Sequence, residues 1–172
     1  MIKIAPSVLA ADFGDLRNDV IEVEKAGADW LHIDIMDGHF VPNLSMGPDI
    51  VKSIREASGL FFDCHLMVEN PEMFVEPFIK AGAELICFHA ECVEDMDALI
   101  DKIHSYGVKA GVSVKPNTPA EAVFPYLEKD REVAKTYRLQ KSRLHRFCFG
   151  AAFSLLQRGF SAVFPLSGGP AC

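Results

Sequence analysis

The sequence lacks the features that mark membrane, secreted and nucleic-acid-binding proteins. None of its stretches approaches 18 consecutive apolar residues, so we expect no membrane-spanning helix. The first ten residues, MIKIAPSVLA, have too short an apolar run and no cleavage-site pattern for a secretory signal. Basic residues are outnumbered, with 17 Lys and Arg against 24 Asp and Glu, which disfavours a nucleic acid or an anionic membrane as partner.

A cysteine pattern for disulfides or zinc is also lacking. The chain has five cysteines, and Cys87 and Cys92 lie close together without a second such pair. Unpaired thiols of this kind are typical of a reducing compartment, and we expect the chain in the cytoplasm.

The charge distribution divides the sequence near Lys129. Residues 1–129 hold 10 Lys and Arg and 22 Asp and Glu, a net charge of −12, whereas residues 130–172 hold 7 and 2, a net charge of +5. Regular patterning ends at the same place, and no clear strand follows. We therefore predict a folded segment over 1–129 and an atypical basic and apolar tail over 130–172. The tail is either an unusual helix packed on the outside or out-of-frame translation.

Apolar strands and amphipathic helices alternate up to Lys129, which predicts βαβ units and a parallel sheet. The expected strands are residues 2–9, 30–36, 61–67, 84–89 and 110–114. The expected helices are residues 14–26, 47–57, 71–81, 93–106 and 119–128. Five βα units are visible, whereas a (β/α)8 barrel needs about 250 residues, or about 200 at the short end. The visible units are thus too few for a complete barrel of this kind.

An internal echo supports this pattern. AGADWLHID and AGAELICFH share Ala-Gly-Ala-acid followed by an apolar strand. Gly27 and Gly82 are each expected to end a helix in the left-handed conformation before the next strand begins.

Buried strands carry the residues of chemical interest. Alternate side chains of a strand face the same way, so His32 shares a face with Asp34, and Asp63 shares one with His65. Two imidazoles and a carboxylate on neighbouring strands are suitable ligands for a divalent metal. Taken singly, each of these histidines is more often a hydrogen-bonded core residue, and Asp37-Gly38 alone is compatible with a simple turn.

Four separated motifs resemble the ribulose-phosphate 3-epimerase family over residues 1–129. In chain order they are APSVLAAD, LHIDIMDGHFVPNLSMGP, DCHLMVENP and KPNTP, which begin at Ala5, Leu31, Asp63 and Lys115. The resemblance implies a (β/α)8 TIM barrel with one divalent metal ion, which could be zinc, iron, manganese or cobalt. It also implies a sugar-phosphate substrate and a homo-oligomer.

The resemblance assigns roles to particular residues. It implies that His32, Asp34 and His65 bind the metal, and that Asp34 also transfers a proton. The substrate contacts that it implies are Ser7, His65, Met36 and Met67. The implied reaction interconverts D-ribulose 5-phosphate and D-xylulose 5-phosphate through an enediolate.

Two parts that the family uses are missing from residues 130–172. The family's second proton-transferring aspartate, which is its fourth metal ligand, follows a later strand in an Asp-Gly-Gly context. In residues 130–172 only Asp130 and Glu132 are acidic, and the family's glycine-rich phosphate loops are absent. Ser167-Gly168-Gly169 resembles such a loop, but no helix is expected after it whose N-terminus could face an anion. We therefore expect this chain to be weakly active or inactive.

There are two alternative functions. A metal-free phosphate-sugar decarboxylase of similar fold needs Asp-x-Lys-x-x-Asp on this strand, but Met36 stands where the lysine should be. A non-catalytic binding or regulatory protein on a partial barrel stays open as an alternative.

Overall fold

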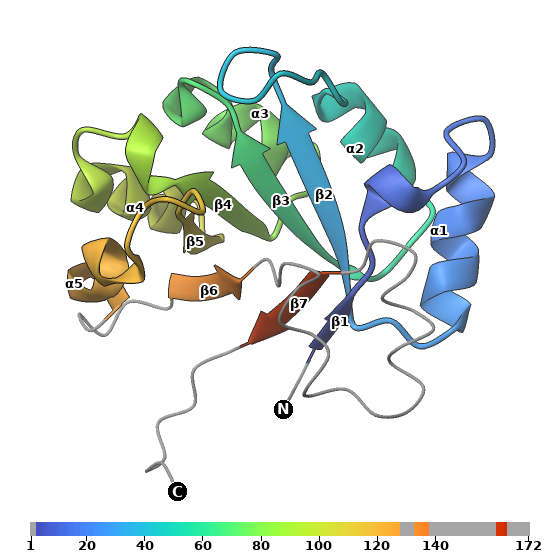
Figure 1. Cartoon of the computed structure of the whole chain (residues 1–172). Helices are drawn as coiled ribbons and strands as arrows, with labels where there is room; N and C mark the ends of the chain where they lie inside the picture. Colours follow the sequence, from blue (N-terminus) through green and yellow to red (C-terminus); the bar gives the residue numbers. More distant parts are fainter. Residues whose placement is uncertain (1–2, 128–132, 138–160, 165–172) are drawn as a thin grey trace, which may run out of the picture.

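The computed structural model describes residues 3–127, 133–137 and 161–164 (Figure 1). The strands are β1 Lys3–Ala5, β2 Trp30–Met36, β3 Phe61–Met67, β4 Leu85–His89, β5 Lys109–Ser113, β6 Val133–Tyr137 and β7 Ser161–Phe164. The α-helices are α1 Leu16–Lys25, α2 Pro48–Arg55, α3 Val75–Lys80, α4 Met96–Ser105 and α5 Phe124–Leu127. Short 3-10 turns are η1 Val8–Ala10, η2 Pro71–Met73, η3 Ala90–Cys92 and η4 Ala120–Val123. None of the helices in these ranges is long and apolar enough to cross a membrane.

The sheet has the order β1-β7-β6-β5-β4-β3-β2, and β2 to β6 run parallel. Its two ends also meet, because Asp29 N–H donates to the Ile4 carbonyl at 3.0 Å and His32 N–H donates to the Pro6 carbonyl at 2.9 Å. The strands therefore surround an interior, as in a barrel (Figure 1). β7 is antiparallel to both of its neighbours, whereas the strands of a (β/α)8 barrel are all parallel.

The two faces of the parallel strands differ in chemistry. The apolar core contains the face that packs on the helices, with Ile33 and Ile35 of β2 and Leu66 of β3 against Val51 and Phe78, among others. The opposite face carries buried polar side chains, namely His32, Asp34, Asp63, His65, His89 and Ser113. Strand alternation thus separates a packing face from a polar interior.

The five predicted βα units are confirmed, with β2 and β3 at their expected bounds. The prediction of a strand over residues 2–9 was wrong at its C-terminal end, because β1 ends at Ala5. Ser7 caps the turn η1, since its side-chain oxygen accepts the Leu9 N–H, and this turn interrupts the strand.

The expectation that no strand follows Lys129 was also wrong for two short segments. β6 pairs with β5, and β7 pairs with β6 and β1. The backbone edges of β5 and β1 provide hydrogen-bonding groups that a strand of almost any sequence can use, so side-chain patterning does not reveal such a pairing. The remaining residues of the predicted tail lie outside the described residues, and the boundary between 1–129 and 130–172 stays a prediction.

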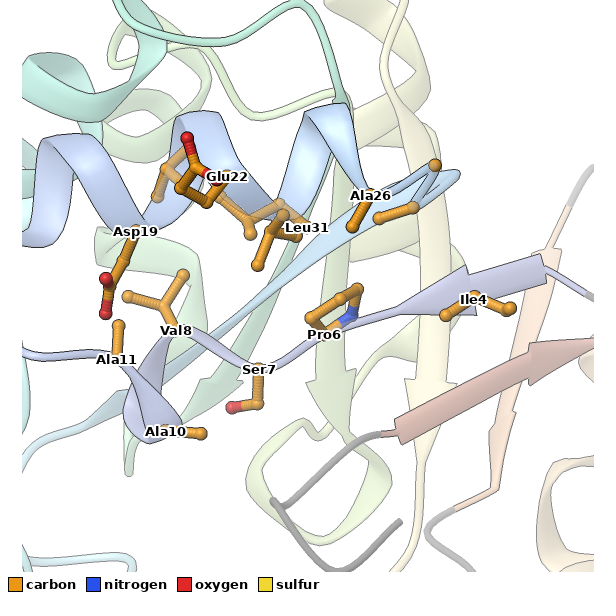
Figure 2. Close-up of a pocket in the computed structure, with 14 residues that line it drawn as sticks. Ile4, Pro6, Ser7, Val8, Ala10, Ala11, Asp19, Glu22, Ala26 and Leu31 are labelled. Carbon is orange, nitrogen blue, oxygen red and sulfur yellow. The ribbon is translucent and has the colours of Figure 1, made fainter. Parts of the chain in front are cut away.

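A groove of about 550 Å³ lies between α1 and the segment formed by β1 and η1 (Figure 2). Pro6, Val8 and Leu31 contribute apolar surface to it, and Asp19 and Glu22 of α1 contribute carboxylates. The hydroxyl of Ser7 points away from α1 in Figure 2, toward the interior where Asp34 lies. Ser7 thus borders both the groove and the interior, whereas His32, Asp34 and His65 do not line the groove.

The two echoed glycines have the left-handed conformation that the sequence predicts, but their surroundings differ. Gly27 has φ +88° and nothing within 4 Å of an added Cβ. Gly82 has φ +108°, and its added Cβ would lie 2.6 Å from Arg55 Cδ. Arg55 cannot move freely, because its guanidinium lies 3.8 Å from the Phe62 ring centroid and donates to the Leu60 carbonyl at 2.8 Å.

We expect Gly82→Ala to destabilise the chain more than Gly27→Ala. Positive φ alone costs about 1–2 kcal/mol for alanine at either position. At Gly82 the loss of Arg55 contacts adds about 1.5 kcal/mol or more, as expected for hydrogen bonds from a charged group. Urea unfolding of both variants checks this, and equal losses of unfolding free energy would contradict the role given to Arg55.

Candidate metal centre

β2 and β3 bring three predicted ligands together. The two strands pair in parallel with Asp34 opposite His65 and His32 opposite Asp63. One nitrogen or oxygen atom from each of His32, Asp34 and His65 lies within 4.8 Å of the others, and all three residues are buried. The parallel register of two polar strands thus creates the cluster.

Asp63 holds the ring of His32. The Nδ1 of His32 lies 2.7 Å from Asp63 Oδ2, and its Nε2 lies 3.2 Å from Asp34 Oδ1. Burial favours the neutral ring, but the two carboxylates outweigh it and raise the pKa of His32 to about 10. A protonated ring donates to both carboxylates. A neutral ring that donates from Nδ1 to Asp63 presents the Nε2 lone pair toward Asp34.

Asp34 is the centre of the cluster. Its Oδ1 lies 3.2 Å from His32 Nε2 and 3.2 Å from His65 Nδ1, and its Oδ2 accepts the Ser7 hydroxyl at 2.9 Å. Burial would raise the pKa of Asp34, but the hydrogen bonds from the two imidazoles prevail and hold it well below its usual value. Asp34 is therefore an ionised carboxylate in the interior.

His65 connects the cluster to a further histidine on β4. The Nε2 atoms of His65 and His89 lie 3.0 Å apart, and the rings are stacked with centroids 5.0 Å apart. Burial and the neighbouring His65 together lower the pKa of His89 to about 4, against the opposing effect of Glu91. His89 is thus neutral near pH 7.

The donor set fits a divalent metal ion. Two imidazole nitrogens and a carboxylate oxygen are suitable for zinc, iron, manganese or cobalt, and the cost of burying the carboxylate is offset by coordination. Asp63 supplies the carboxylate partner that metal-binding histidines usually have. His32, Asp34 and His65 could therefore hold one such ion, with Nε2 of His32 and Nδ1 of His65 directed toward Asp34.

Asp37, which directly follows β2, has a different role. Its Oδ1 accepts the N–H groups of His39 and Phe40, both at 2.9 Å, and its Oδ2 accepts the Glu69 N–H at 2.8 Å. It thus closes its own turn and ties that turn to the loop after β3. Burial opposes ionisation, but the three N–H donors prevail and lower the pKa of Asp37.

Asp37→Asn is expected to cost about 1–3 kcal/mol near neutral pH, because the amide sets a donor against one of the N–H groups. The lowered pKa means that this stabilisation is present above the ordinary value of 3.8 and is lost as the pH falls through the folded value. Urea unfolding of both proteins at pH 6 and pH 3 measures this. A difference in unfolding free energy that does not shrink at pH 3 would contradict the assignment.

The structure also places the predicted substrate residues. Ser7 lies beside Asp34, and Met36 and Met67 lie opposite each other at the ends of β2 and β3. Their contact with a substrate stays a prediction.

Sequence reasoning missed two residues around the cluster. Asp63 was placed on the face of His65 without a role, and no contact between His89 and His65 was expected. The polar identity of Asp63 on a largely apolar strand was an available signal, as was its spacing from His65. For His89, the echo of AGAELICFH with AGADWLHID marks an equivalent strand but does not reveal the contact with His65.

Comparison with known proteins gives a consistent result over the same residues. The family model described as "Ribulose-phosphate 3 epimerase family" matches residues 3–133. The ribulose-phosphate 3-epimerase of Schizosaccharomyces pombe is 47% identical over 130 residues, which cover 74% of this chain and 57% of that protein. The cytoplasmic isoform of ribulose-phosphate 3-epimerase from Oryza sativa subsp. japonica is 48% identical over 132 residues, which cover 76% of this chain and 58% of that protein. The ribulose-phosphate 3-epimerase of Bacillus subtilis is 49% identical over 123 residues, which cover 72% of this chain and 57% of that protein.

The chain thus spans less than two thirds of the length of these relatives. Among solved structures, a dihydropteroate synthase from Xanthomonas albilineans aligns with a TM-score of 0.47 and 12% identity over 72% of this chain and 50% of that chain. That similarity is too low to support an inference.

Proposed function

The chain belongs to the ribulose-phosphate 3-epimerase family, and from this premise we propose that residues 3–127 are the metal-binding part of an epimerase barrel. The proposed reaction is the interconversion of D-ribulose 5-phosphate and D-xylulose 5-phosphate. The observation that carries the proposal is the buried group of His32, Asp34 and His65, with the imidazole of His32 held by Asp63.

The chemistry requires a base and stabilisation of negative charge. Removal of the C3 proton, next to the C2 ketone, gives an enediolate with negative charge on oxygen. A bound divalent ion supplies positive charge that stabilises those oxygens.

Asp34 is the proposed base, because it is ionised and lies at the centre of the cluster. Ser7 holds Oδ2 of Asp34 through its hydroxyl and thereby fixes the direction of the carboxylate. Met36 and Met67, at the ends of their strands, are proposed to form the apolar wall beside the substrate and to exclude water. A base of this kind contributes about 10²–10⁴-fold to the rate.

Inversion at C3 also needs a proton from the opposite face. The family supplies it from an aspartate in an Asp-Gly-Gly sequence, and residues 130–172 contain no such sequence. We therefore propose that this chain alone is weakly active or inactive, although it retains the buried group of His32, Asp34 and His65. A regulatory role for a chain that binds metal without turnover is the alternative.

The proposal extends to partners and compartment. The substrate class is a sugar phosphate, and a homo-oligomer is expected from the family. Among the described residues, Cys64, Cys87 and Cys92 form no disulfide, which is consistent with a reducing compartment such as the cytoplasm.

A chimaera tests the proposed role of residues 1–127 without the influence of the tail. These residues are joined to the C-terminal part of the Bacillus subtilis relative that follows the aligned region. We expect epimerase activity in the chimaera, and a loss of about 10²–10⁴-fold in kcat on Asp34→Asn. A chimaera that folds and binds metal but does not form D-xylulose 5-phosphate would overturn the proposal.

A further inference from the structure

His65, His89 and Glu91 form a row of three side chains that leads away from Asp34. His65 faces Asp34 with Nδ1 at 3.2 Å and faces His89 with Nε2 at 3.0 Å. On the far side of His89, Nδ1 lies 3.4 Å from Glu91 Oε2. The row therefore leads from the candidate metal centre through β4 to the turn η3.

The positions of the protons in this row depend on one another. Two imidazole nitrogens 3.0 Å apart can interact only if one donates and the other accepts. Metal binding by His65 through Nδ1 requires a lone pair there, so its proton is on Nε2 and is donated to His89. The proton of His89 is then on Nδ1, where it faces the Glu91 carboxylate.

The far end of the row is itself fixed by neighbouring loops. Glu91 Oε1 accepts the Lys115 N–H at 2.7 Å, so the carboxylate cannot turn away from His89 freely. The ring of Phe40 packs on His89 with centroids 4.8 Å apart, and Lys115 Nζ lies 3.8 Å from the Phe40 ring centroid. Residues of three loops thus hold His89 in one orientation.

We infer that His89 is a positioning residue, which accepts the Nε2–H of His65 and thereby keeps Nδ1 of His65 directed at the metal. The inference rests on the proposed function, because it requires that His65 binds a metal. Glu91 supports His89 less directly than Asp63 supports His32, because its carboxylate lies at 3.4 Å from Nδ1 of His89 and forms no hydrogen bond with it. Each metal-binding imidazole then has its own support from a neighbouring strand or turn.

Imidazole ¹⁵N NMR of the full Zn²⁺-loaded chain tests the inference without any substitution. We expect His65 to carry its proton on Nε2 and His89 to carry its proton on Nδ1. His65 protonated on Nδ1, or His89 protonated on Nε2, would overturn the inference.

Two variants test it by metal affinity. His89→Phe keeps an aromatic ring against Phe40 and removes the acceptor, whereas His89→Gln retains an acceptor oxygen. We expect the Co²⁺ Kd to rise about 10–100-fold for His89→Phe and to stay within about threefold of wild type for His89→Gln. Thermal unfolding without metal separates this effect from a loss of stability, because a positioning role leaves the Tm of both variants close together.

The remaining outcomes distinguish the two proposals. If wild type does not bind Co²⁺, the proposed function fails, and the inference fails with it. If wild type binds Co²⁺ and His89→Phe binds it equally well, only the inference fails. Equal weakening in both variants, together with equal losses of Tm, would show that His89 has only a structural role and would also overturn the inference.

Discussion

D-Ribulose 5-phosphate, incubated in heavy water with the metal-loaded chain, is expected to give D-xylulose 5-phosphate at least about 10⁴-fold more slowly than with the full-length Bacillus subtilis relative. A second acid is needed to deliver a proton to the opposite face of C3, and one such group contributes about 10²–10⁴-fold. The missing phosphate loops remove further binding that would orient the sugar. NMR measures both the product and the deuterium at C3.

The full-length relative under the same conditions is the positive control, and the chain with its metal removed by chelation is the negative control. Formation of D-xylulose 5-phosphate with deuterium at C3, at a rate near that of the relative, would contradict this expectation. It would mean that another group in this chain supplies the second proton.

His32→Ala is expected to weaken Co²⁺ binding by at least about 100-fold. Structural zinc sites with four protein ligands have binding free energies of about 10–16 kcal/mol, so one ligand is worth roughly 3 kcal/mol or more. The substitution also leaves Asp63 without its partner in the interior. Titration of the metal-free protein with Co²⁺ against a competing chelator measures the change in Kd.

His39→Ala is the matched control, because His39 follows the same strand but is exposed and lies outside the cluster. We expect its Co²⁺ affinity to match that of wild type. Equal affinities for wild type and His32→Ala would contradict the assignment of His32 as a ligand.

Much of the fold was predictable because the strand signals are local. β2 and β3 are apolar segments in which the polar residues stand two positions apart, so the bounds and the faces of both strands follow from the sequence. The approach of His32, Asp34 and His65 follows from the same alternation once the strands are taken as neighbours.

Features that depend on contacts between distant segments were not predictable. β6 and β7 occupy their places through backbone pairing, which places little demand on side-chain pattern. The contact of His89 with His65 depends on the register between β3 and β4, and that register cannot be inferred from a single sequence. The end of β1 was misplaced because the cap at Ser7 outweighs the apolar run that follows it.

X-ray absorption at the zinc K-edge of the Zn²⁺-loaded, 172-residue chain tests the central claim most directly. The account predicts two imidazole nitrogens at about 2.0–2.1 Å with the other ligands oxygen, and no sulfur shell. A sulfur shell near about 2.3 Å would instead place the metal on the cysteines. That result, or a spectrum without imidazole, would contradict the metal centre of His32, Asp34 and His65.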